Sequence, residues 1–461
     1  MKTIFFFSIP AHGHTNPMIS VARELVRRGN VVRFYSFSEF REKIEKTGAV
    51  FVSCDAYLGK LSEREEKKLK KVSTTEMTSQ AIRLTLAMNT FLKEEFAAHK
   101  PDVVYTDSVC FHGKLNAWKH NVPMVVSTST FAFNQMSSQY MKHSAALLAD
   151  MIFGLPKISK ELALLKPYGY KVKNALSLVQ SDNGTDSVVY TSKSFQPYGE
   201  SFSEHYAFVG PSVPSDKLPN KEKARPLVYI SLGTVINERP DFYKKCIEAL
   251  GGCDTDVIIS CGRGTDIASL GVLPENVRVY PHVNQVEVLA EADVFISHCG
   301  MNSVSESLYM ATPLVLYPQT GEQNAVARRV AEKGAGLILR DDSARGIASA
   351  VFEVMGNPEY KTAAKACSDD FRSCSGAVGA AEFIENAPHT FSGVDIIEEL
   401  NKSNILFQVI YWLVVSFLII SLGVFVGWKY VWTIGIAASI FSNPIGKAAQ
   451  KKKYKELIKK K

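Results

Sequence analysis

The fold of this chain is decided by nine residues, HCGMNSVSE at positions 298–306. An apolar run at 292–297 precedes them and predicts a buried parallel strand, and the pattern after them predicts a helix. A strand–helix turn rich in His, Gly, Asn and Ser is typical of a phosphate site, because backbone N–H groups and the positive end of the helix dipole converge there. Glu306, one turn into the helix, could accept hydrogen bonds from a ribose diol. The stretch therefore suits a nucleotide diphosphate, although an ordinary turn would show the same pattern.

The rest of the chain alternates strands with helices in two series. This alternation predicts two parallel, doubly wound α/β halves facing a central cleft. A proline-rich stretch at 211–226 separates them and indicates an exposed linker. A helix is expected from Pro17 to Arg28 in the first half. The strands are expected at 4–9, 31–35, 50–53, 103–106 and 124–127, and then at 227–231, 257–261, 277–280, 294–297, 314–317 and 337–339.

The composition is that of an ordinary globular protein, with 46% hydrophobic and 21% charged residues among 461. Eight cysteines occur without a CxxC pair, which favours the reduced thiols of a cytosolic protein over a disulfide framework. The first ten residues hold too short an apolar run for a signal peptide and are expected to form the first strand.

The carboxy-terminal end predicts contact with a membrane. Residues 447–461 hold eight lysines and one glutamate, a net 8 − 1 = +7, which equals the charge of the whole chain and leaves the body neutral. A nucleic-acid partner is therefore not expected. Residues 405–428 carry no charge and are long enough to cross a bilayer, and a second apolar stretch follows at 430–441. The two form a hairpin that returns the basic tail to the cytoplasm, or lie in the interface, or make a buried helical subdomain.

Two residues of the first half suggest acid–base chemistry. His14 follows the first strand, and Asp107 follows the strand at 103–106, so both are expected at the carboxyl edge of the sheet, where ligands bind. His14 suits a general base, and an aspartate bonded to its distal nitrogen would fix the tautomer. His12 competes with His14 for this role, and either histidine could simply cap a turn.

Two sites in the second half suggest sugar and phosphate binding. Glu322 and Gln323 follow the strand at 314–317 and could clamp sugar hydroxyls, although Glu-Gln pairs are common in surface loops. Thr234, after the strand at 227–231, could offer a hydroxyl to a phosphate.

With these elements in order, residues 1–390 resemble the UDP-glycosyltransferase superfamily, glycosyltransferase family 1, and most closely its bacterial macrolide-type branch. The resemblance implies a GT-B fold, with two Rossmann-like domains that bind the acceptor in the first half and the nucleotide sugar in the second. The positions that carry it are His282, Val283, Gln285, Leu289, Phe295 to Gly300, Asn302, Ser303, Glu306, Pro313, Pro318, Glu322 and Gln323.

The resemblance also implies a role for each of these residues. His14 would deprotonate the acceptor with help from Asp107, giving inversion without a metal or other cofactor. Glu306 would bind the ribose, and Glu322 with Gln323 the sugar. The base and ribose would border His282, Val283 and Gln285, and the diphosphate would lie at Thr234, His298, Gly300, Asn302 and Ser303.

Three positions depart from the family pattern. His282 and Met301 stand where tryptophan is frequent, and Glu322 stands where aspartate is commoner, which leaves the choice of nucleotide and sugar open. Animal relatives combine a carboxy-terminal span and basic tail with a signal peptide, and here the signal peptide is missing.

The sequence therefore predicts a metal-independent, inverting hexosyltransferase that uses a UDP-sugar and a small lipophilic acceptor, such as a lipid, terpenoid, polyketide or xenobiotic. Alternatives are an idle, membrane-bound nucleotide-sugar-binding protein, and a phosphorylase or epimerase. A metal site at Asp254 and Asp256 is disfavoured, because these residues precede a strand. The protein is expected at a membrane, with its globular part in the cytoplasm. The expected boundaries are 1–210 for the acceptor domain, 211–226 for the linker, 227–390 for the donor domain, 404–446 for the membrane segments and 447–461 for the tail.

Overall fold

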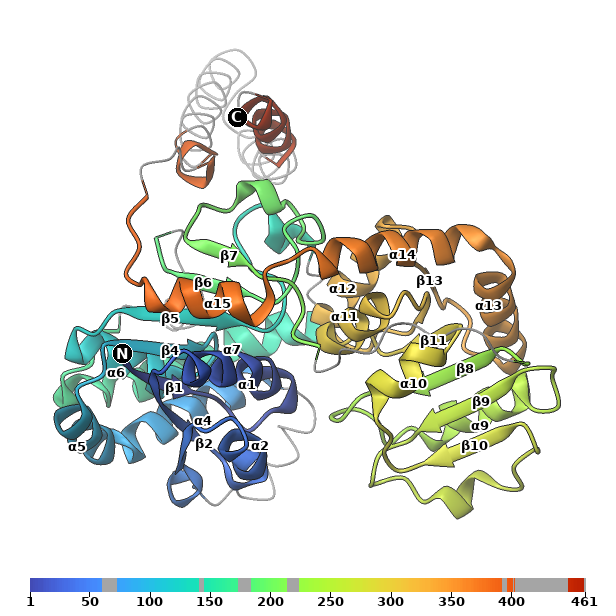
Figure 1. Cartoon of the computed structure of the whole chain (residues 1–461), viewed down its shortest axis with the longest axis horizontal. Coiled ribbons are helices and arrows are strands. Elements are labelled where there is room, and N and C mark those ends of the chain that lie inside the picture. Colours follow the sequence, from blue (N-terminus) through green and yellow to red (C-terminus); the bar gives the residue numbers. More distant parts are fainter. Residues whose placement is uncertain are drawn as a thin grey trace, which may run out of the picture.

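The computed structural model contains two α/β domains that lie side by side (Figure 1). The first is built around strands β1 to β7 and the second around β8 to β13. The structure describes residues 1–59, 73–140, 145–172, 184–213, 224–391, 396–400, 402 and 447–459.

The first domain holds a seven-stranded sheet in the order β3-β2-β1-β4-β5-β6-β7, in which neighbouring strands run parallel. This is the doubly wound arrangement that the sequence predicts. The strands are β1 (Thr3–Phe7), β2 (Val31–Ser36), β3 (Val50–Ser53), β4 (Val103–Asp107), β5 (Met124–Thr128), β6 (Ser187–Val189) and β7 (Tyr206–Phe208). The helices are α1 (His12–Arg27), α2 (Arg41–Glu45), α4 (Thr74–Ala87), α5 (Asn89–His99), α6 (Phe111–His120) and α7 (Ala145–Ala163), with short turns η1 (Ser38–Phe40), η2 (Asp55–Tyr57), η3 (Ser137–Tyr140), η4 (Lys166–Tyr168) and η5 (Gly199–Ser201).

The second domain repeats the plan with a six-stranded parallel sheet in the order β10-β9-β8-β11-β12-β13. Each strand lies within two residues of its predicted position. The strands are β8 (Leu227–Ser231), β9 (Asp256–Ser260), β10 (Val277–Tyr280), β11 (Val294–Ser297), β12 (Leu314–Leu316) and β13 (Gly336–Ile338). The helices are α9 (Pro240–Leu250), α10 (Gln285–Glu291), α11 (Met301–Tyr309), α12 (Gly321–Glu332), α13 (Ala344–Gly356) and α14 (Pro358–Arg372), with a turn η6 (Ile267–Leu270).

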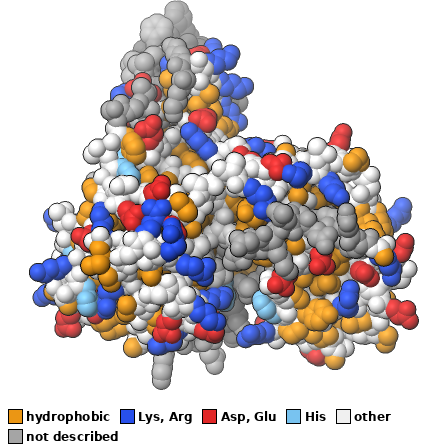
Figure 2. Space-filling view, viewed as in Figure 1, with side chains coloured by type: hydrophobic (Ala, Val, Ile, Leu, Met, Phe, Trp, Pro, Cys, Tyr) orange, Lys and Arg blue, Asp and Glu red, His pale blue; other side chains and the backbone are white. Residues whose placement is uncertain are grey.

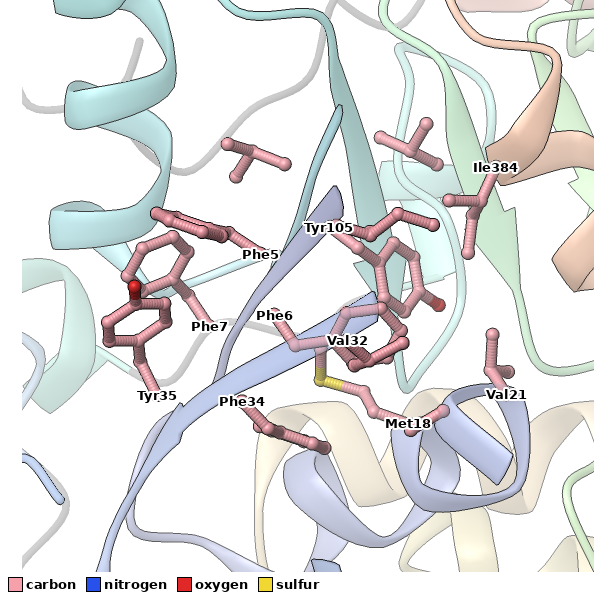
Figure 3. Close-up of a cluster of buried hydrophobic side chains, with 14 of the residues drawn as sticks. Phe5, Phe6, Phe7, Met18, Val21, Val32, Phe34, Tyr35, Tyr105 and Ile384 are labelled. Carbon is pink, nitrogen blue, oxygen red and sulfur yellow. The ribbon is translucent and has the colours of Figure 1, made fainter. Parts of the chain in front are cut away.

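Strand β1 anchors the core of the first domain. Its Phe5, Phe6 and Phe7 are fully buried (Figure 3), and burial of each side chain contributes on the order of 2 kcal/mol. Phe7 stacks on Tyr35 with ring centroids 4.6 Å apart, and Phe6 meets Tyr105 edge-on at 4.8 Å. This packing fixes the strand whose carboxyl end leads into helix α1.

Helix α1 begins at His12, whereas the sequence predicted a start at Pro17. The proline therefore lies inside the helix rather than at its first turn. Strands β6 and β7 were not predicted, because three residues are too few to show an alternating pattern.

The second domain was predicted to extend to residue 390, but the last helix in this range packs against the first domain. Helix α15 (Gly376–Glu385) crosses back and buries Ala380, Ala381 and Ile384 in the core of the first domain. Figure 3 shows Ile384 among these core side chains. Arg28, at the end of α1, bonds to Glu382 at 3.1 Å and Glu385 at 3.0 Å on this helix. The chain after α14 thus ties the two domains together.

The predicted membrane segments at 404–446 lie outside the described residues. Within the part of the chain that the structure describes, no helix combines the length and the hydrophobicity that a bilayer crossing requires. Residues 447–458 are helical, and Tyr454, Leu457 and Ile458 belong to an apolar cluster that includes Met136 and Tyr198 of the first domain.

Candidate active site

The carboxyl edge of the first sheet brings His14 and Asp107 together. His14 stands in the first turn of α1, and Asp107 is the last residue of β4, directly beside β1 in the sheet. The Nδ1 atom of His14 lies 2.8 Å from Oδ2 of Asp107. Asp107 is fully buried, and its other oxygen accepts a hydrogen bond from the Val109 N–H at 2.9 Å. The aspartate is therefore fixed, and the imidazole presents its opposite nitrogen, Nε2, away from it.

His12 does not share this position. Its Nε2 lies 3.5 Å from Glu39, and its ring meets Phe40 edge-on at 5.0 Å, so it faces the neighbouring turn η1. His14 is the histidine that pairs with the buried aspartate.

Ser129 is a member of this site that the sequence reasoning missed. It follows β5, the next strand beyond β4, and its Oγ lies 3.2 Å from Nδ1 of His14. Asp107 accepts a hydrogen bond from the Nδ1–H group of His14, and the Ser129 oxygen is a second acceptor for the same N–H. A polar residue directly after the adjacent strand was the available signal, and it follows from the same sheet-edge rule.

The surroundings of His14 raise its pKa to about 9. Burial is the largest single effect and lowers the pKa, but the charge and hydrogen bond of Asp107 together outweigh it, and the charge of Glu322 in the second domain adds to the rise. In the ligand-free protein the imidazole is therefore mostly protonated at pH 7. It becomes a competent base as the pH approaches 9.

A proline in α1 frees a backbone oxygen that bridges the two domains. Pro17 has no N–H, so the Gly13 carbonyl four residues earlier has no helical donor. That oxygen instead accepts a hydrogen bond from Nδ2 of Asn302 at 3.1 Å. The predicted phosphate turn and the first turn of the His14 helix are thus in direct contact.

His298 occupies a slot that two glycines leave open. A Cβ atom at Gly233 or at Gly300 would stand 2.5 Å from the His298 ring, closer than real contacts allow. The Nδ1 atom is buried and has no partner among the described residues. Burial lowers the pKa of His298 to about 4, against a hydrogen bond with the Ser231 backbone, so the ring is neutral. An unpaired, buried ring nitrogen favours a polar ligand at this place.

A hydrogen-bond network joins three predicted residues of the donor side. Nε2 of Gln285 donates to Glu306 at 2.6 Å and to Ser303 at 3.2 Å, and its Oε1 accepts from the Tyr229 hydroxyl at 3.2 Å. Burial raises the pKa of Glu306 to about 6, although the Gln285 bond opposes the rise. One carboxylate oxygen of Glu306 accepts the Gln285 hydrogen bond, and the other is left for a ligand. Tyr229 is a second residue of the site that was not predicted from the sequence.

Helix α12 carries the predicted sugar clamp, but Gln323 also has a structural task. Its Oε1 accepts from the backbone N–H groups of Thr320 at 3.1 Å and Gln319 at 2.8 Å, completing a capping box. The amide nitrogen is the part of this side chain that can turn to a ligand. Glu322 is exposed in the same turn and acts electrostatically on His14.

The other residues predicted to bind the donor make no described side-chain hydrogen bond that assigns them a role. Thr234 and His282 are exposed in loops, and Val283 packs partly against the core of the second domain. Asp254 and Asp256 lie at the opposite, amino end of β9. Their carboxylates lie near arginines, with Asp254 3.1 Å from Arg225.

Comparisons with known proteins point to one family. Residues 217–370 match the family model described as UDP-glucoronosyl and UDP-glucosyl transferase. The NDP-glycosyltransferase YjiC of Bacillus licheniformis is 33% identical over 404 residues, covering 83% of this chain and 97% of that protein. The demethyllactenocin mycarosyltransferase of Streptomyces fradiae is 29% identical, covering 84% of this chain and 86% of that protein.

Solved structures show the same architecture. The calicheamicin glycosyltransferase CalG4 superposes with a TM-score of 0.67 at 27% identity, covering 84% of this chain and 97% of that chain. The glycotransferase of kitacinnamycin gives a TM-score of 0.70 at 24% identity, covering 83% and 98%, and this likeness concerns the fold.

Proposed function

Because the chain belongs to the UDP-glucoronosyl and UDP-glucosyl transferase family, in its bacterial macrolide-type branch with the GT-B fold, we propose that it moves a hexose from a UDP-sugar to a hydroxyl of a small, lipophilic acceptor with inversion. The observation that carries the proposal is the His14–Asp107 pair, 2.8 Å apart, at the edge that Asn302 of the second domain reaches.

The first domain supplies the base. Asp107 holds the Nδ1 proton of His14, so Nε2 has a lone pair once the imidazole is neutral. The acceptor hydroxyl gives its proton to Nε2, and its oxygen forms a bond to the anomeric carbon. The bond from that carbon to the diphosphate oxygen breaks on the opposite face, and the UDP leaves. Displacement from the opposite face produces inversion.

The second domain would hold the leaving group. The first turn of α11 has glycine as its N-cap and no capping side chain, so its N–H groups are available to an anion. The negative charge of a diphosphate there would favour protonation of His298, whose Nδ1–H would then donate to a phosphate oxygen. Glu306 would accept from the ribose through its remaining oxygen, and Glu322 with the Gln323 amide would contact the sugar. No metal or other cofactor takes part in this scheme.

The membrane contact stays part of the proposal, with the globular domains on the cytoplasmic side. Residues 396–400 pack in the same apolar cluster as Leu457 and Ile458 of the tail. The shared cluster supports a hairpin rather than a single crossing between residues 402 and 447, because a single crossing would place these two ends on opposite sides of the membrane. A lipophilic acceptor agrees with this location.

The test is product analysis. The purified full-length protein is given several UDP-sugars and a hydrophobic metabolite extract, and products are identified by mass spectrometry and their anomeric configuration by NMR. We expect a glycoside of inverted configuration. UDP release that is equally slow with and without acceptor would favour an idle binding protein, and turnover of nucleotide sugar without any acceptor would favour an epimerase or phosphorylase.

A further inference from the structure

The carboxy-terminal helix, residues 447–458, has two chemically distinct faces. Tyr454, Leu457 and Ile458 recur at helical spacing and belong to an apolar cluster with Met136 and Tyr198 of the first domain and Ile396, Ile397 and Leu400. Lys452, Lys455 and Lys459 recur on another face of the helix, and these three lysines are exposed, as are Lys447 and Lys451 near the start of the helix. Figure 2 shows Lys and Arg side chains along the right edge of the upper projection, where Figure 1 places this helix. The apolar face is thus occupied, and the face left for a partner is basic.

The occupied face rests on the segment that follows β5. Gln450 donates to Gln135 at 3.4 Å, and the helix shares an apolar cluster with the fully buried Met136. The Tyr454 ring meets Tyr198 edge-on, with centroids 5.3 Å apart. Ser129, at the start of the same segment, contacts His14. One stretch of chain therefore contacts both the tail helix and the proposed base.

Tyr198 connects the tail helix to the second domain through Tyr140. Its ring meets Tyr140 edge-on at 5.8 Å, and the Tyr140 hydroxyl donates to Glu332 on α12. The Arg328 guanidinium lies 4.3 Å above the Tyr140 ring. Tyr198 has a φ of +52°, a left-handed conformation that a non-glycine residue adopts only where its surroundings hold it in place.

Helix α12 connects this contact to the sugar site. Its last turns carry Arg328 and Glu332, and its first turn carries Glu322 and Gln323. Arg329, between them, donates to backbone oxygens of the first domain at 2.7 and 2.8 Å. Because a helix moves as a unit, the contacts at its end influence where its first turn lies relative to His14.

We propose that residues 447–459 are a docking surface for an anionic lipid surface, and that docking is coupled through Tyr454, Tyr198 and Tyr140 to the position of α12. The charge argues for this partner, since the described tail holds six lysines and one acid. The uncharged residues 405–428 that precede it in the sequence argue for the same partner. The coupling rests on the proposed function, because it regulates that site.

The docking is tested with vesicles and the full-length protein. Co-sedimentation is measured with phosphatidylcholine vesicles that contain or lack phosphatidylglycerol. Apolar binding by other segments is the same for both kinds of vesicle, so the ratio of the two affinities reports the preference for anionic lipid. The triple variant Lys451→Glu, Lys455→Glu, Lys459→Glu is expected to lose the preference for anionic vesicles by about 100-fold or more. A control with the same charge change at Lys43, Lys244 and Lys361, which are exposed elsewhere, should keep it. Equal preference in the tail variant and the wild type overturns the docking.

The coupling is tested by hydrogen exchange of α12, which needs no turnover. Anionic vesicles are expected to raise amide protection at 321–332 in the wild type and in Tyr454→Phe, which keeps the ring contact. Tyr454→Ala should still bind the vesicles but lose that rise. An unchanged rise in Tyr454→Ala, or none in the wild type, overturns the coupling. Absence of glycoside formation together with these exchange changes would reject the proposed function alone.

Discussion

Replacement of Asp107 by Asn tests the His14 base through its dependence on pH. The substitution keeps the shape of the side chain but removes the charge and the charge-assisted bond that raise the pKa of His14. In this variant burial, the largest effect, still lowers the pKa of His14, and only the charge of Glu322 still raises it. The pKa of His14 should fall from about 9 to below its usual 6.5.

The size of the effect follows from the fraction of neutral imidazole. With a pKa of about 9, roughly 1% of His14 is neutral at pH 7, and most of it is neutral at pH 10. In Asp107→Asn, roughly three quarters or more is neutral already at pH 7. The ratio of wild-type to variant kcat/KM should therefore grow by about 70-fold between pH 7 and pH 10. At pH 10 the variant should be slower by roughly 10²–10⁴, since its base is weak and poorly oriented.

The assay is UDP release at subsaturating substrate, because kcat/KM reports the protonation of the free enzyme. Asp241→Asn, an exposed residue in the first turn of α9, serves as the matched control and should follow the wild type at every pH. A wild-type to Asp107→Asn ratio that stays constant across this range would refute the reasoning.

Three further changes probe the donor side and the fold. Gly300→Ala should displace His298 and weaken UDP binding by tenfold or more in calorimetry. The control Gly356→Ala, whose added methyl group meets open space, should leave UDP affinity unchanged. Equal UDP affinity in Gly300→Ala and the wild type would show that the position of His298 does not matter for UDP binding. UDP affinity should fall as the pH drops through about 6, where Glu306 takes up a proton, and Glu306→Gln should bind about tenfold weaker with no such pH step. Because the folded pKa of His14 is raised, its contribution to stability is complete below pH 6.5 and is lost as the pH passes about 9. Urea unfolding should show His14→Gln less stable than wild type by up to about 3 kcal/mol at pH 6 and nearly equal to it at pH 10.

The sequence was sufficient for strands β1 to β5 and β8 to β13 and for the pairing of His14 with Asp107. Both follow from local patterns, since buried strands show as apolar runs and their carboxyl ends share one edge. The capping role of Gln323 was missed although Thr320 and Gln323 have the spacing of a capping box, because Gln323 was assigned with Glu322 to sugar binding. Asn302 reaching Gly13 was missed because a contact 289 residues apart leaves no local pattern.

Other features depend on tertiary packing in the same way. Helix α15 reads as part of the second domain, yet the space beside β1 and α1 determines where Ile384 is buried. The start of α1 at His12 was hidden by Pro17, which usually marks a first turn and here lies inside the helix.

The most direct test of the central claim compares turnover and UDP affinity in His14→Ala. If the imidazole acts on the acceptor and the second domain alone grips the nucleotide, turnover should fall by about 100-fold or more while calorimetric UDP affinity stays within about twofold. Turnover equal to that of the wild type, or a parallel loss of UDP affinity, would contradict this division of labour between the two domains.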